Sequence, residues 1–222
     1  ALELGLELGA RTDGHVSVIT MGPDQAREVL LEAVCMGAER GYLISDRCFA
    51  GADVCATSHT LSQGIRQSGT YDLILCGKQT TDGDTAQVGA ETAEFLGIAH
   101  GANILEVLET GDTFVTVRMN LENKIQTQKM ELPCLLTVDK DVNTPRLPSY
   151  KRRIGMDPGC IKVMGLDDLE DRDPGHYGLK GSPTQVERIF PPDKKTDKEI
   201  MEGTGRELAQ AMAAVLRKHK FI

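Results

Sequence analysis

The sequence predicts an α/β fold: a three-layer, Rossmann-like parallel sheet with an added antiparallel section and a C-terminal arm. Three short apolar runs, at residues 15–21, 41–45 and 72–76, each precede a longer segment whose apolar residues have helical spacing. Strands that alternate with helices of this length are typical of a parallel sheet with helices on both faces. The runs are continuous rather than alternating, which favours strands that are buried on both sides.

Turn residues and helix signals divide the first half of the chain. Residues 15–21 are rich in β-branched side chains, which predicts a strand, and Gly22-Pro23-Asp24 ends it. The chain opens in an expected helix without an initiator methionine, so we expect further residues upstream. In chain order the expected elements are strand 15–21, helix 24–36, strand 41–45, helix 50–67, strand 72–76 and helix 86–96.

The pattern changes after Gly101. Gly111-Asp112 and Glu122-Asn123 supply turn chemistry between short strands, which predicts an antiparallel meander. Its expected strands are 103–109, 113–120, 124–131 and 135–139. Beyond Pro145 the chain is rich in Pro, Gly and charge until a final expected helix at 198–218.

The tail is too small to build a core alone, so it should pack on the domain or on a partner. We therefore divide the chain into an α/β domain, residues 1–190, and a C-terminal arm with a helix, residues 191–222.

Composition excludes several classes of function. The net charge is −8, Trp is absent and aromatic residues make up 4% of the chain, so no nucleic-acid partner is expected. The six cysteines form no C-x-x-C pair, which favours reduced, buried thiols in a cytoplasmic protein. The apolar stretches are far shorter than the ~20 residues of a membrane span, and no signal peptide is visible. The sequence shows no metal-ligand pattern and no side-chain constellation for catalysis.

Residues 76–89 carry the main signal for ligand binding. They connect the third strand to a helix, and in open parallel sheets ligands bind beyond the carboxyl ends of the strands. A helix that begins there offers unpaired N–H groups and partial positive charge to a phosphate. Several small residues would let a ligand approach the backbone closely: Gly83, Thr85, Ala86 and Gly89.

The same segment has a simpler interpretation. Asp84 followed by Gln87 matches a helix N-cap with a Gln at the third helical position. Asp82 and Asp84 would repel a phosphate unless they cap the helix, face away or accept hydrogen bonds from hydroxyl groups. A strand, a loop with two glycines and a helix are a weak fingerprint, so the residues alone leave both interpretations open.

Longer strings make the nucleotide interpretation specific. Gly77-Lys78-Gln79, followed by residues 82–89, closely resembles the signature of the electron-transfer flavoprotein beta (small) subunit. Further stretches agree with this family in the same order: 18–23, 33–38, 43–46, 49–53, 145–149 and 178–184. The resemblance covers almost the whole chain. Family members normally begin with another strand and an Asn-Pro loop, which have no match here.

The resemblance implies a nucleotide in the domain of residues 1–190 and a heterodimer with an alpha subunit, on which the arm packs. One kind of beta subunit keeps a structural AMP. The other keeps FAD, which takes hydride from NADH and bifurcates electrons to ferredoxin and, through the alpha-subunit FAD, to an acyl-CoA-dehydrogenase-like flavoenzyme. The small residues at Gly83, Thr85, Ala86 and Val88 resemble the FAD-holding kind. The alternatives are structural AMP or an ATP-using enzyme of the same superfold.

The resemblance also assigns individual residues. The expected cofactor-binding residues are Met21, Gly22, Cys76, Gly77, Lys78, Gln79, Asp82, Gly83, Asp84, Thr85, Ala86, Gln87, Val88, Gly89 and Thr92. Leu169, within the acidic segment 167–171, matches a recognition loop whose leucine anchors in the partner dehydrogenase. His176 lies in a polar loop and is expected at the surface. In this interpretation the protein binds and tunes the flavin, which performs the redox chemistry.

Overall fold

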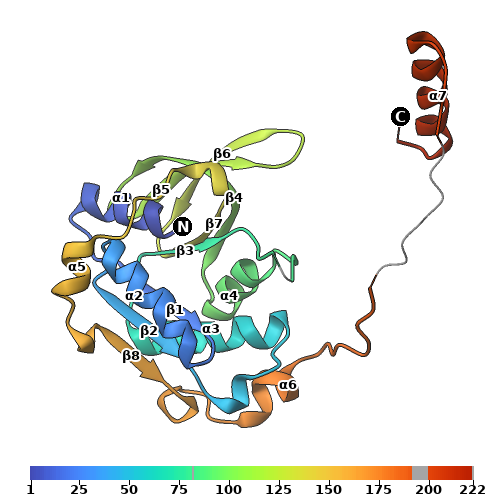
Figure 1. Cartoon of the computed structure of the whole chain (residues 1–222). Coiled ribbons are helices and arrows are strands. Elements are labelled where there is room, and N and C mark those ends of the chain that lie inside the picture. Colours follow the sequence, from blue (N-terminus) through green and yellow to red (C-terminus); the bar gives the residue numbers. More distant parts are fainter. Residues whose placement is uncertain (82, 192–199, 222) are drawn as a thin grey trace. The chain divides into compact units, whose positions relative to one another are not determined.

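The computed structural model describes residues 1–81, 83–191 and 200–221 (Figure 1). The chain divides into two compact units, Ala1–Gln185 and Val186–Ile222, which are described separately. The first unit contains two sheets. Sheet A has the strand order β1-β2-β8, and sheet B has the order β3-β7-β4-β5-β6.

Sheet A is fully parallel, as the sequence predicts for its first two strands. It comprises β1 (Ser17–Met21), β2 (Arg40–Ile44) and β8 (Ile161–Met164). The sequence analysis did not identify β8, which has only four residues and lies in a segment rich in Gly, Pro and charge. β2 lies in the centre and is buried from its second residue onward.

Helices cover both faces of sheet A. On one face Leu30 of α2 (Arg27–Met36) packs with Leu43 and Ile161. On the other face α3 (Val54–Ser68) approaches closely, because a Cβ at its Gly64 would meet Ile44 Cδ1 at 2.2 Å. Side chains alternate across a strand, so neighbouring residues of β2 serve the two helices. This arrangement confirms the three-layer α/β architecture (Figure 1).

Sheet B joins parallel and antiparallel strands. β3 (Leu73–Gly77) and β4 (Ala99–Thr110) both run parallel to β7 (Cys134–Val138), which lies between them. β5 (Phe114–Asn120) and β6 (Ile125–Glu131) continue from β4 as an antiparallel meander.

The prediction that all four later strands form one meander is therefore wrong for β7. All five of its residues are buried, as is typical of a central parallel strand.

The remaining helices of the first unit position the loops. α1 (Leu2–Thr12) contributes Leu4 and Leu8 to the core of sheet B. α4 (Val88–Leu96) follows β3, and α5 (Tyr150–Ile154) and α6 (Gly178–Gly181) lie in the segments around β8. No helix in the described part of the chain is long and apolar enough to cross a membrane.

The second unit contains α7 (Gly205–Lys218), which begins in a capping box formed by Thr204 and Glu207. The first two residues of the helix predicted at 198–218 lie outside the described residues, and α7 itself begins at Gly205. α7 is strongly amphipathic, yet none of its side chains is buried. Such a helix has an apolar face without a core of its own.

Candidate functional site

The predicted nucleotide segment begins where two parallel strands end side by side. Gly77 closes β3, and the next residue donates its backbone N–H to Val138 O, the end of β7, over 3.0 Å. The Lys78 ammonium lies 3.5 Å from Asp139 Oδ2. Since β3 and β7 are parallel, this is the carboxyl edge at which α/β sheets bind ligands.

Sequence analysis missed Asp139 as part of this edge. A sequence signal for it was present, because Asp139 directly follows the apolar strand β7, as Lys78 directly follows β3. Assigning the β7 segment to the meander removed it from the neighbourhood of Lys78.

The described residues of the loop between β3 and α4 are largely exposed, and two of them have an unusual backbone. Asp84 and Ala86 have φ values of 50° and 57°, in the left-handed region that non-glycine residues rarely adopt. Asp84 Oδ1 accepts a hydrogen bond from Gln79 Nε2, so this carboxylate is engaged within the loop. Asp82, a predicted site residue, lies outside the described residues.

The N-terminus of α4 carries no side-chain cap. The helix begins at Val88, and its N-cap residue Gln87 makes no capping hydrogen bond. The predicted cap by Asp84 is therefore wrong, because that carboxylate bonds to Gln79 instead. The backbone N–H groups of the first turn have no intrahelical acceptor, so they remain available to an anion.

Gly89 has a packing role at the start of α4. A Cβ there would meet Thr137 Cγ2 at 2.4 Å and Cys76 Sγ at 2.8 Å. The glycine therefore lets α4 pack closely on β3 and β7. A Cβ at Gly77, in contrast, would meet no atom within 4 Å.

A buried hydroxyl lies one turn further along α4. Thr92 is 3% exposed, and among the described residues its Oγ1 has no hydrogen-bond partner. Buried polar groups almost always have one, so this orphaned hydroxyl fits a ligand bound at the helix start. Burial raises the pKa of Cys76 to about 11, which keeps its thiol protonated beneath the loop at neutral pH.

Met21 and Gly22 lie at a different strand end. Met21 closes β1 in sheet A, and the Gly22 N–H donates to Ile44 O at 3.1 Å. The predicted cofactor residues that the structure describes therefore form two groups: Met21 and Gly22 at the end of β1, and those from Cys76 to Thr92 at the end of β3, in the following loop and in α4.

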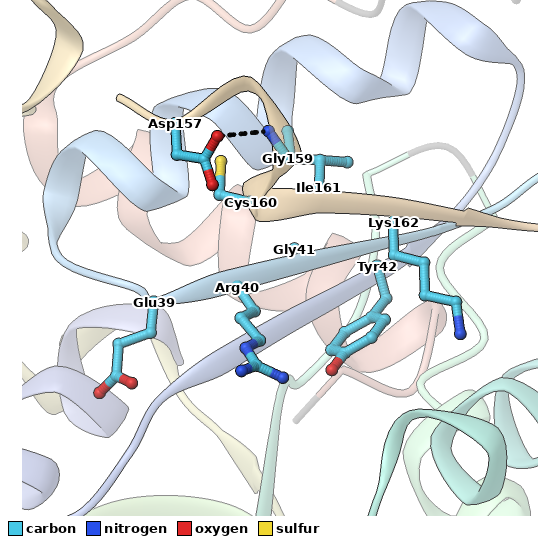
Figure 2. A pocket seen from close by; sticks show the side chains of 9 residues that line it. All are labelled: Glu39, Arg40, Gly41, Tyr42, Asp157, Gly159, Cys160, Ile161 and Lys162. Atoms are coloured by element: carbon cyan, nitrogen blue, oxygen red, sulfur yellow. Dashed lines mark hydrogen bonds between the residues drawn. The ribbon is translucent and has the colours of Figure 1, made fainter. Parts of the chain in front are cut away.

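A hollow of about 600 Å³ opens elsewhere, at the start of β2 and β8 (Figure 2). Arg40, Tyr42 and Lys162 project into it from neighbouring strands, and Asp157 accepts a hydrogen bond from the Gly159 N–H. This is the amino end of the parallel strands, opposite to the edge where such sheets bind ligands. We assign it no function. No cluster of His, Cys, Asp and Glu suited to a metal ion occurs in the described parts of the chain.

Comparisons with known proteins identify the family of the chain. The family model described as "Electron transfer flavoprotein domain" matches residues 1–164. The chain belongs to the electron-transfer flavoprotein family. Over its whole length it is 39% identical to the electron transfer flavoprotein subunit beta of Clostridium acetobutylicum, of which it covers 85%.

Two other relatives are subunits of named reductase systems. The chain is 38% identical, over its whole length and 85% of the relative, to the Caffeyl-CoA reductase-Etf complex subunit CarD of Acetobacterium woodii. It is 36% identical, over 99% of its length and 84% of the relative, to the Acryloyl-CoA reductase electron transfer subunit gamma of Anaerotignum propionicum. These matches place it among the beta subunits of the family.

In this electron-transfer flavoprotein subunit, Leu169 is not an exposed anchor. Its side chain is 1% exposed and lies in a core cluster with Tyr42, Ile44, Met164 and Tyr177. The residues that follow Leu169 fold its side chain onto sheet A. A docking role for Leu169 remains a prediction, and it would require this side chain to leave the core.

Proposed function

We propose that this beta subunit holds the pyrophosphate of FAD between the loop after β3 and the N-terminus of α4. The observation that carries the proposal is the uncapped start of α4, reached through an exposed loop at the carboxyl edge of β3 and β7. Helix N-termini in this position bind phosphates through free N–H groups and the helix dipole. The orphaned Thr92 hydroxyl adds a donor or acceptor in the same helix.

The charges of the loop are compatible with a phosphate. Asp84 is turned to Gln79, which reduces its repulsion of an anion. Lys78 supplies an ammonium group, positioned by Asp139 at 3.5 Å. The backbone N–H groups of the first turn of α4 and the Thr85 hydroxyl would complete the donor set. Met21 and Gly22, after β1, would contact the adenosine portion.

When bound, FAD would accept hydride from NADH and pass single electrons along two routes. The protein would bind and orient it, since hydride transfer to a flavin needs no general base. We propose ferredoxin as the low-potential acceptor, and the alpha-subunit FAD followed by an acyl-CoA-dehydrogenase-like flavoenzyme as the other route. The relatives named as parts of caffeyl-CoA and acryloyl-CoA reductase systems support this assignment.

The alpha subunit would also cover the arm. α7 presents an amphipathic face with no buried side chain, and Val186, Ile189 and Phe190 are largely exposed. Apolar surface of this kind marks a protein interface. We propose that the C-terminal arm packs on the alpha subunit.

Counting nucleotides in the purified alpha–beta complex tests the cofactor assignment. Release by heat, followed by chromatography, should give two FAD per heterodimer. One FAD and one AMP would assign the chain to the non-bifurcating kind with structural AMP. ATP together with a single FAD would favour an ATP-using site of the same superfold.

Ala86→Trp should remove the beta-subunit nucleotide while the alpha-subunit FAD remains. A large side chain in a loop that closely approaches the ligand occupies the ligand's volume, and close-packed sites accommodate added volume poorly. Ala86→Gly is the matched control, because glycine readily adopts the φ of 57° seen here and adds no atoms. Wild-type nucleotide content in the Trp variant would show that the site lies elsewhere.

A further inference from the structure

A carboxylate shared by two histidines joins the segment after β8 to α3. Asp171 Oδ2 lies 2.7 Å from His176 Nδ1 and 3.2 Å from His59 Nε2. A carboxylate only accepts hydrogen bonds, so both ring nitrogens must donate to it. The two imidazoles meet edge to face, with ring centroids 6.3 Å apart.

Further hydrogen bonds fasten the same segment to α3. The Asp171 N–H donates to Gln63 Oε1 at 3.2 Å, and the Tyr177 hydroxyl donates to the Asp171 carbonyl. Residues 59 and 63 are one helical turn apart and therefore lie on the same face of α3. The ring of Tyr177 lies 5.1 Å from that of His59. The segment 169–177 thus rests on one face of α3 through a small polar cluster.

We propose that His59, Asp171 and His176 form a proton-sensitive clasp that fixes the segment 169–177 against α3. The function of this clasp does not depend on which nucleotide the subunit holds. It acts on the segment that leads into residues 178–184, which are bonded to the start of α3: Asp53 Oδ2 accepts from the Thr184 N–H at 2.9 Å. The clasp therefore controls how firmly the chain is anchored before it continues into the arm.

Electrostatics at the clasp favour the charged pair. The hydrogen bond that His176 donates to Asp171, and then the charge of Asp171, raises the pKa of His176. Burial acts to raise the pKa of Asp171, but hydrogen bonds from the Asp173 N–H and His176 outweigh it, and the net pKa is lowered. Both shifts have the sign expected of an ion pair with hydrogen bonds.

The other ionisable groups around the clasp differ in charge. Asp173 Oδ2, 3.9 Å from His176 Nε2, also favours a protonated ring. Lys180 and Cys55 line a hollow of about 320 Å³ beside both imidazoles. On the far side, the Cys48 thiol lies near the Tyr177 hydroxyl.

These shifts define a pH window for the closed clasp. A raised His176 pKa contributes stability that is complete below the unfolded value of about 6.5 and is lost as pH rises through the folded value. A lowered Asp171 pKa contributes stability that is complete above about 4 and is lost as pH falls through the folded value. The clasp should therefore be firmest between about pH 4 and 6.5 and should loosen in alkali.

Hydrogen exchange of the full chain at pH 6 and pH 8, corrected for intrinsic rates, tests the clasp. Amides of 169–177 should lose protection several-fold at pH 8, while β2 and α4 keep theirs. His176→Gln should abolish this pH dependence. His15→Gln, at the exposed pair with Glu39, is the matched control and should preserve it. Equal corrected protection at both pH values, or unchanged dependence in His176→Gln, would overturn the proposal.

Histidine NMR provides a second measurement that does not depend on exchange. The His176 resonance in wild type should titrate above the ordinary value, and in Asp171→Asn it should return towards it. Asp173→Asn should have a smaller effect, because its carboxylate is farther from the ring. A His176 titration unaffected by Asp171→Asn would show that the pair is not coupled in solution.

Discussion

Leu169→Ala is expected to lower the free energy of unfolding by about 2–5 kcal/mol, the usual cost of truncating a fully buried leucine. The side chain is 1% exposed and packs between sheet A and the segment that continues to Tyr177. Truncation would leave a cavity in a cluster closed by Ile44 and Met164, both fully buried. Urea unfolding should show a lower midpoint with an unchanged slope.

Two further variants distinguish an effect of Leu169 on stability from an effect on binding to the dehydrogenase. Leu179→Ala, at a side chain that is 54% exposed, should change stability by less than about 0.5 kcal/mol. Leu169→Met conserves volume and should cost less than about 1.5 kcal/mol. If Leu169→Met keeps stability but weakens binding to the dehydrogenase, the leucine itself contacts the partner. If Leu169→Ala is as stable as wild type, the side chain does not lie in this core.

The elements of the fold that could be predicted from sequence are those with local signals. β1, β2 and β3 lie where short apolar runs are bounded by Gly, Pro or Asp. The helices between them were predicted from the helical spacing of their apolar residues. β7 is predicted as a strand, but its partners are not. It pairs with β3 and β4 in parallel, and no local pattern distinguishes that pairing from a continued meander.

The candidate site also has features with a local sequence signal and features without one. Strand–loop–helix order predicted the loop between β3 and α4. The cap of α4, in contrast, depended on side-chain geometry, and Asp84 bonds to Gln79 rather than to the helix. Contacts between distant segments had no signal at all. His59 and Asp171 are 112 residues apart, and each has an unremarkable local context. Leu169 has acidic neighbours in sequence, and no local pattern predicts its burial, which depends on contacts with Tyr177 and with residues of sheet A.

A partly buried ion pair between α1 and the segment after β7 should have a pH-dependent effect when it is broken. Glu3, 5% exposed in α1, accepts hydrogen bonds from Arg146 Nε at 2.9 Å, Nη2 at 2.8 Å and the backbone N–H at 3.0 Å. Arg146→Ala leaves this carboxylate buried without its cation. Because the Arg146 side chain is 45% exposed, we expect a loss of about 1–3 kcal/mol at pH 7, less than for a fully buried pair.

The sign of the pH dependence follows from the pKa of Glu3. The hydrogen bond from Arg146 is the main cause of its lowering, against an opposing effect of burial. The pair therefore contributes stability above the unfolded pKa of Glu3, and this contribution is lost as pH falls through the lower folded value. Unfolding free energies of wild type and Arg146→Ala should converge as the pH falls below about 4.

A matched control comes from an exposed pair. Glu39→Gln removes the partner of His15 in a pair whose side chains are 53% and 86% exposed, so it should leave the free energy of unfolding nearly unchanged. A loss in Arg146→Ala that stays constant as the pH falls from 7 to well below 4 would contradict the ion-pair argument. That result would indicate that the arginine stabilises the fold through the packing of its aliphatic stem on α1.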